Sequence, residues 1–162
     1  MHKVNSGNLQ DIVKLLIELE LAMGEFYETC SLRWPEDENF WKNIGGQELQ
    51  HADYLQKMSD IISTGSEKFM LGRKVNPLAI NTVVSGTKRN RELVTSNTLT
   101  KIKTLYVARD MENSALESRL DQIVKTDDLE FLELAGKILL QTQNHKNTLN
   151  NKIAELHTNK GI

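Results

Sequence analysis

A seam of regularly spaced positions in residues 41–62 is the feature that most constrains the fold of this chain. Its members step by three and four residues, the spacing that places side chains on one face of an α-helix. They are Trp41, Ile44, Glu48, His51, Leu55, Met58 and Ile62. Most of them are apolar, so this face is expected to pack against other helices. Glu48 and His51 then lie at positions that should be apolar, where a buried charge is costly unless it is paired or bound to a metal.

A second seam near the start of the chain has the same construction. Its positions alternate steps of four and three residues: Leu9, Val13, Leu16, Glu20, Met23, Tyr27 and Cys30. A glutamate again interrupts an apolar face. Pro35, followed by three acidic residues, suits the first turn of the next helix. The short connection predicts an antiparallel hairpin of helices over residues 8–32 and 36–62.

The second half of the chain predicts another pair of helices, over residues 98–124 and 127–158. The first carries Ile102, Leu105, Glu112, Leu116 and Ile123 near its inward face. The second has the seam Phe131, Ala135, Ile138, Thr142, His145, Leu149 and Leu156. Residues 63–97 between the pairs are too long for a turn and contain scattered glycine and proline. We expect a crossover there that spans the bundle, with short helices at 77–84 and 89–95.

Composition narrows the class of protein further. The 162 residues suit one domain, and 20 basic against 22 acidic residues, without a block of like charge, argue against a nucleic-acid or membrane partner. A single cysteine, Cys30, excludes an intrachain disulfide and a Cys-x-x-Cys iron centre, as in a reducing compartment. The start of the chain has no apolar signal core, so we expect a cytoplasmic protein.

The two halves repeat one another. Glu20 is followed after 28 residues by Glu48, with His51 three further on. Glu112 is followed after 30 residues by Thr142, with His145 three further on. Each half therefore reads as helix, turn, helix, with a seam carboxylate on its first helix and a seam histidine on its second. A carboxylate and an imidazole one helical turn apart can bind the same cation.

This pattern resembles the ferritin-like superfamily, and in particular the rubrerythrin-like diiron-carboxylate domains. The resemblance implies one all-α domain over residues 1–162, an antiparallel four-helix bundle with a long crossover between its second and third helices. It also implies the metal ligands Glu20, Glu48, His51, Glu112 and His145, with Glu48 bridging two ions. Tyr27, seven residues after Glu20, matches a tyrosine often found near the iron in that family, which makes it the candidate catalytic residue.

The resemblance implies a function as well. Two iron ions, or one, are the expected cofactor, with manganese or zinc as alternatives. The expected chemistry is that of an oxidoreductase of peroxidase or ferroxidase type, acting on peroxide, dioxygen or ferrous iron. Because the chain has no Cys-x-x-Cys centre, electrons would come from a separate donor protein or from ferrous iron itself. A homodimer is expected because many members of the superfamily dimerise.

Three departures from the family pattern leave the occupancy of the site open. Thr142 replaces the second bridging glutamate, Arg119 stands where symmetry with Tyr27 suggests a tyrosine, and Arg109 lies one turn before Glu112. The sequence leaves three alternatives. The site binds two metals, it binds one metal at Glu20, Glu48 and His51, or it binds none and an arginine pairs with Glu112. The alternative function is a non-catalytic helical bundle with a degenerate or single-metal site, acting as an interaction protein.

Overall fold

The computed structural model describes residues 6–114 and 119–159, and most of them are helical. The α-helices of this part of the chain are α1 (Ser6–Arg33), α2 (Glu38–Thr64), α3 (Pro77–Thr95), α4 (Lys101–Asn113), α5 (Leu120–Ile123) and α6 (Leu129–Asn159). Short 3-10 helices cover Pro35–Asp37 and Ser66–Lys68, and two short strands, β1 (Met70–Leu71) and β2 (Val124–Lys125), pair with each other. The predicted all-α class is therefore confirmed. Within the described residues, no helix is both long and apolar enough to pass through a membrane.

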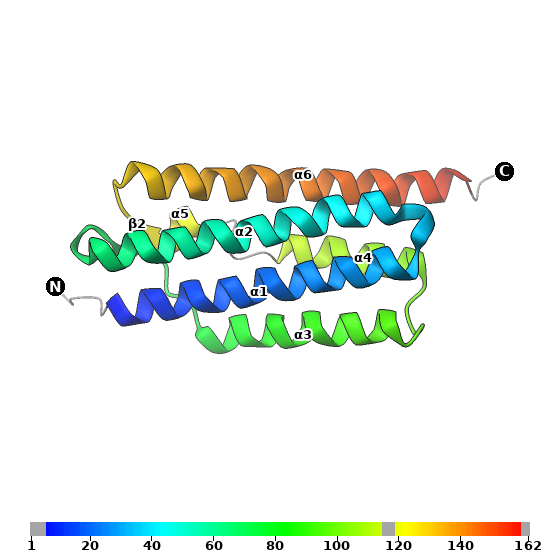
Figure 1. The fold of residues 1–162 in the computed structure, drawn as a ribbon, viewed down its shortest axis with the longest axis horizontal. Coiled ribbons are helices and arrows are strands. Elements are labelled where there is room, and N and C mark those ends of the chain that lie inside the picture. The colour runs from blue at the N-terminus through cyan, green and yellow to red at the C-terminus, as the bar shows by residue number, and fades with distance from the viewer. Residues whose placement is uncertain (1–5, 115–118, 160–162) are drawn as a thin grey trace.

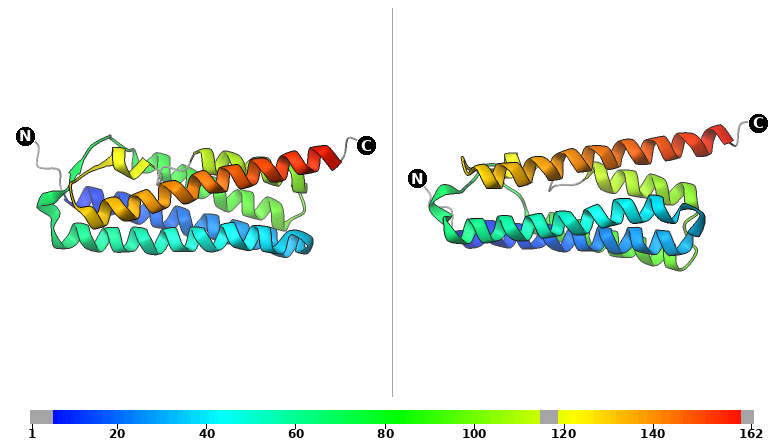
Figure 2. Two further views of the ribbon diagram at one scale, coloured as in Figure 1. Left: turned by 90° about the horizontal axis from the view of Figure 1, so that it is seen from above. Right: turned by 45° about the horizontal axis from the view of Figure 1, so that its top comes forward.

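Helices α1 and α2 form a closely packed hairpin, and α4 packs against α6 (Figure 1). Helix α6 also contacts α2, and α3 lies along the outer side of α1. The views in Figure 2 show that the long helices run nearly along one axis. Side chains from α1, α2, α4 and α6 therefore meet in the interior, while α3 covers a flank of α1.

The seams predicted from the sequence are buried. All seven positions from Leu9 to Cys30 on α1 are at most 2% exposed, and all seven from Trp41 to Ile62 on α2 are at most 3% exposed. On α6 the seam is buried from Phe131 to Leu149, whereas Leu156 is only partly buried and Ile153 takes over as the inward residue. The apolar faces of these helices thus drive their packing, and the polar seam residues are carried into the interior with them.

The crossover is more ordered than predicted. Instead of two short helices at 77–84 and 89–95, one helix runs from Pro77 to Thr95 without a break. Asn76 caps its first turn, and Ser85-Gly86 does not interrupt it because Gly86 lies on an open face. Ile80, Val84 and Val94 are at most 4% exposed. Their burial beside α1 explains why a helix forms where the apolar pattern is sparse.

The predicted third helix over residues 98–124 is wrong in its second half. Helix α4 ends at Asn113, and residues 115–118, which include the predicted seam residue Leu116, lie outside the described residues. Further on, the carbonyls of Gln122 and Ile123 accept hydrogen bonds from the amides of Arg73 and Gly72, at 2.9 and 2.8 Å. This contact with the crossover continues the pairing of β1 and β2. The extended residues of β2, Val124 and Lys125, cannot belong to a continuous helix, and Ile123 is buried from the short helix α5 instead.

Two glycines allow α1 and α2 to approach closely beside the polar seam residues. A Cβ atom at Gly45 would lie 3.0 Å from the Cβ of Tyr27, and one at Gly24 would lie 3.1 Å from Cδ2 of Leu49. The neighbouring Gly46 has no atom within 4 Å of such a Cβ. Close helix packing therefore accounts for Gly45, while Gly46 only weakens the helix.

We expect alanine to have opposite effects at these adjacent positions. Gly46→Ala should raise the free energy of unfolding by roughly 0.5–1 kcal/mol, because alanine favours the helix and meets no neighbour. Gly45→Ala should lower the free energy of unfolding by about 1–2 kcal/mol, because overpacking against Tyr27 outweighs the same gain in helix propensity. Urea unfolding followed by circular dichroism measures both. Equal stabilisation by the two substitutions would contradict the close approach.

Candidate metal centre

The five predicted ligands come together in the interior, each from the helix that the sequence assigned to it. Glu20 lies on α1, Glu48 and His51 on α2, Glu112 on α4 and His145 on α6. None of them is more than 2% exposed. Their oxygen and imidazole nitrogen atoms form two groups of three, and in each group the atoms lie within 4.8 Å of one another. Each group could hold a metal ion.

The first group consists of Glu20, Glu48 and His51. The Nδ1 atom of His51 lies 3.6 Å from Oε1 of Glu20 and 3.5 Å from Oε2 of Glu48. The two residues of α2 meet here because they are three positions apart, one helical turn. Glu20 reaches them from α1, across the hairpin in which the helices pack closely.

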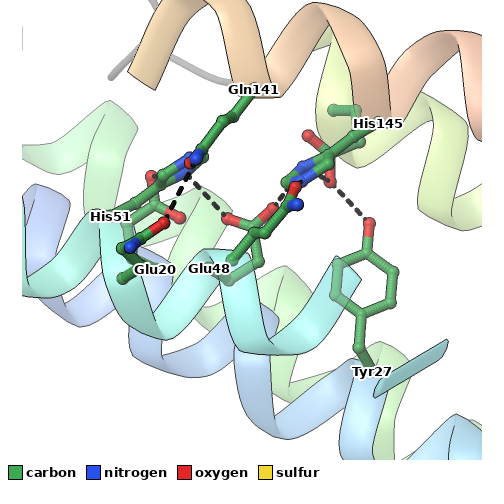
Figure 3. Close-up of polar contacts among 9 residues, drawn as sticks. Glu20, Tyr27, Glu48, His51, Gln141 and His145 are labelled. Atoms are coloured by element: carbon green, nitrogen blue, oxygen red, sulfur yellow. Dashed lines mark hydrogen bonds and ion pairs between the residues drawn. The ribbon is translucent and has the colours of Figure 1, made fainter. Parts of the chain in front are cut away.

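The second group consists of Glu48, Glu112 and His145. The Nδ1 atom of His145 lies 2.8 Å from Oε1 of Glu48 and 3.5 Å from Oε1 of Glu112. Glu48 is therefore common to both groups, one oxygen facing each histidine, and Figure 3 shows it between the two imidazoles. The rings of His51 and His145 are nearly parallel, with centroids 5.6 Å apart. One carboxylate between two histidines is the arrangement that a bridging ligand requires.

Two glutamines that the sequence analysis missed hold the outer sides of the histidines. The Nε2 atom of His51 lies 2.7 Å from Oε1 of Gln141, and Nε2 of His145 lies 2.5 Å from Oε1 of Gln47. Gln141 also donates from its amide nitrogen to Gln50 at 3.1 Å, which leaves its oxygen to face His51. An amide oxygen only accepts, so each Nε2 donates to its glutamine, and Nδ1 is the nitrogen that each ring directs to the carboxylates.

The contacts of these glutamines are reciprocal. Gln47 precedes Glu48 on α2 yet holds the histidine of α6, and Gln141 precedes Thr142 on α6 yet holds the histidine of α2. The sequence contained a signal for this, because glutamine stands at the same place in both halves: four residues before each seam histidine. Partners of this kind orient a ligating imidazole and fix its tautomer.

Tyr27 lies at the edge of the second group. Its hydroxyl donates a hydrogen bond of 2.7 Å to Oε1 of Glu112 (Figure 3). Its ring stacks on Trp41, with centroids 6.0 Å apart, and contacts Phe26 edge to face. The candidate catalytic tyrosine is thus brought to the site, where it fixes the carboxylate of α4 from α1.

The arginines do not pair with Glu112 within the described part of the chain. Arg109 points to its neighbour Asp110, with Nη2 3.3 Å from Oδ1, and lies over the ring of Tyr106. Arg119 is exposed beside the start of α3. The reading in which an arginine neutralises a metal-free site therefore has no support from this arrangement. Protons or a cation must compensate the buried carboxylates instead.

The pKa shifts show how protons do so in the metal-free protein. Burial raises the pKa of Glu112, and the nearby charge of Glu48 raises it further. Burial opposes ionisation of Glu48 too, but hydrogen bonds with Glu20 and both histidines outweigh it and hold its pKa below the ordinary value. Burial lowers the pKa of His145, but Glu112 and Glu48 raise it to a net value of about 10. Burial and the same carboxylates raise the pKa of Tyr27.

A groove of about 530 Å³ lies between α2 and α6 and extends to His145. Gln47 and His145 form its inner wall. The lining also includes Phe40, Lys42, Asn43, Ile44, Gly46, Asn144 and Thr148. Amide and hydroxyl groups therefore line a groove that ends against one ligand of the second group, His145.

Comparison with known proteins adds no family assignment. No protein-family model, curated protein or solved structure gives a significant match to this chain. The class defined here is thus a helical bundle with two overlapping buried groups of carboxylate and histidine, and the resemblance to rubrerythrin-like domains stays a prediction.

Removing either glutamine contact should weaken metal binding without unfolding the bundle. We expect Gln141→Leu and Gln47→Leu each to lower the affinity for a divalent cation about 10- to 100-fold, because the imidazole loses its orienting partner. Gln141→Glu should keep the affinity, since its carboxylate still accepts from Nε2. Gln143→Leu, exposed on the same helix, is the control. Calorimetric titration with Zn²⁺ measures the affinities; an unchanged affinity in both leucine variants would contradict the role.

The metal-free protein should become less stable as the pH rises from 6.5 to 10. A histidine has a pKa of about 6.5 in an unfolded chain, whereas that of His145 is about 10 in the folded one. Its stabilising contribution is complete below the lower value and is lost as the pH passes through the higher one. The raised pKa of Glu112 acts in the same direction. The midpoint of thermal unfolding, measured with chelator present, should fall over this range, and it should fall less in His145→Gln. An equal fall in both proteins would contradict the assignment.

Proposed function

We propose that the protein binds two iron ions bridged by Glu48 and carries out redox chemistry on peroxide or dioxygen, or oxidises ferrous iron. The observation that carries the proposal is the sharing of Glu48 by two buried ligand groups, each with one histidine Nδ1 facing the carboxylates. Oxygen-rich sets with one imidazole per metal suit iron and manganese. Bound iron would supply the exchange of electrons between ferrous and ferric states.

The residues of the chain have distinct parts in this proposal. Glu20 and His51 would hold one ion, Glu112 and His145 the other, and Glu48 both. Gln141 and Gln47 face Nε2 of the two histidines, so each Nδ1 would be the nitrogen that binds an ion. The hydroxyl of Tyr27 donates to Glu112, with 2.7 Å between the two oxygens, beside the second ligand group and away from water, because its side chain is fully buried. Small reactants would reach the centre along the groove beside Gln47 and His145.

The proposal leaves the electron source outside the chain. The described residues hold one thiol, the buried Cys30, and burial raises its pKa. A buried neutral thiol is a poor redox partner. Electrons for peroxide reduction would therefore come from a separate donor protein, or ferrous iron would itself be the substrate. A homodimer remains the expectation from the family resemblance.

A single-metal protein is the second candidate, and Thr142 is the observation that favours it. The second group lacks the fourth carboxylate of the family pattern, so an ion there would have fewer protein ligands than the family provides. One ion would then be held by Glu20, Glu48 and His51, and the bundle would act in binding rather than catalysis. The number of bound metals distinguishes the two candidates.

We expect two iron ions per chain after anaerobic loading, measured by elemental analysis. Glu48→Gln should lose both, because the bridging carboxylate belongs to both groups. Glu20→Gln and Glu112→Gln should each lose one, because each belongs to one group. Glu25→Gln, on the exposed outer part of α1, should keep both. One ion in the wild type, lost in Glu20→Gln and kept in Glu112→Gln, would establish the single-metal protein.

Redox chemistry is tested separately from metal content. The ferrous protein is mixed with one equivalent of peroxide or with dioxygen, and the rise of ferric absorption in the near ultraviolet is followed. Oxidation that is faster than that of free ferrous iron under the same conditions, and slower in Glu48→Gln, is the expected result. Iron that binds but is not oxidised any faster than free iron would leave the protein a metal binder without this activity.

A further inference from the structure

One buried hydroxyl at the centre has no hydrogen-bond partner among the described residues. The buried threonines of the described helices are Thr87, Thr104 and Thr142. Thr87 and Thr104 each donate to the carbonyl four residues earlier, both at 2.9 Å, which is the usual way to satisfy such a group. The Oγ1 atom of Thr142 makes no such bond, although the residue is only 1% exposed.

The place of Thr142 relates this hydroxyl to the metal ligands. It lies three residues before His145 on α6, so the two side chains project from one face. It also takes the position in the second half that Glu48 takes in the first. A threonine side chain is shorter than that of glutamate by about the size of a carboxylate group. The protein therefore has a shorter side chain and a hydrogen-bond donor where the repeat would place a carboxylate.

Charge gives a second argument, which rests on the proposed function. Two divalent ions bring four positive charges, and Glu20, Glu48 and Glu112 bring three negative ones. With both histidines neutral, one positive charge remains in a buried site. An uncompensated charge in such surroundings is costly, and one bound monoanion would neutralise it.

We propose that the centre binds a small monocarboxylate, of the size of formate or acetate, in the place of the missing fourth carboxylate. The hydroxyl of Thr142 donates a hydrogen bond to it, and its oxygens complete the ligands of the two metals. The groove lined by Asn43, Asn144 and Lys42 offers polar groups along the approach. The chemistry of the site thus selects a carboxylic acid, as substrate or as bridging coligand.

Titration of the cobalt-loaded protein with formate tests the proposal, because the visible spectrum of Co²⁺ reports its ligands without any turnover. We expect a saturable spectral change in the wild type and none with chloride at the same concentration. Thr142→Ser, which keeps the hydroxyl, should bind formate as the wild type does. Thr142→Val, of equal shape, should bind it about tenfold more weakly. Thr142→Glu should retain two cobalt ions and lose the response to formate.

The outcomes separate this proposal from the proposed function. Two cobalt ions with no spectral response to formate would overturn the proposal and leave the two-metal centre intact. An equal spectral response to formate in the wild type and Thr142→Glu would also overturn the carboxylate site alone. So would a response of the wild type to chloride equal to its response to formate. Binding of only one cobalt ion would overturn both the proposed function and the carboxylate site, because a single divalent ion leaves no excess positive charge among three carboxylates. The absence of any bound cobalt would also overturn both. If a variant does not fold, the wild-type titrations with formate and chloride still decide the matter.

Discussion

The compensation of three carboxylates buried at the centre of a helical bundle is the constraint on which this structure depends. Glu48 lies between two histidines, and hydrogen bonds with Glu20 and both histidines hold its pKa below the ordinary value despite burial. Without metal, protons on His145 and Glu112 provide the balance. Apolar residues of similar size would pack in these positions at less cost. The buried charged groups therefore lower the free energy of unfolding unless something compensates their charge. Their presence at seam positions is therefore costly unless protons or a bound cation compensate them.

Helices α2 and α6 share the task of building that centre. Each provides a histidine and also the glutamine that orients the histidine of the other. The two ligand groups are consequently not independent halves, despite the repeat in the sequence. A displacement of α6 relative to α2 would disturb both imidazoles at once, and so would affect both groups together. The groove between these helices ends against His145, so the two helices that set the ligand geometry also line the groove.

The sequence predicted the helical seams from local spacing, and the resemblance to rubrerythrin-like domains then implied which five polar seam residues are candidate ligands. Positions three and four residues apart share a helix face regardless of the tertiary structure. This spacing placed Glu48 and His51 on one face and Glu20 on the seam of the first helix. It did not predict that α4 stops at Asn113. That ending accompanies the contact of Gly72 and Arg73 with carbonyls about fifty residues away, which no local pattern contains. The contacts of Gln47 and Gln141 with the histidines were not predicted either, because each contact joins opposite halves of the chain.

The early end of α4 also changes what Tyr27 does for the molecule. Glu112 is the last residue but one of that helix, where backbone hydrogen bonds are fewest and helices fray. The other candidate ligands lie well inside α1, α2 and α6. The hydrogen bond from the hydroxyl of Tyr27 therefore holds the C-terminal end of α4 against α1. The packing of Gly45 against Tyr27 extends this link, so that a hydrogen atom in place of a methyl group on α2 helps to set the position of a carboxylate on α4.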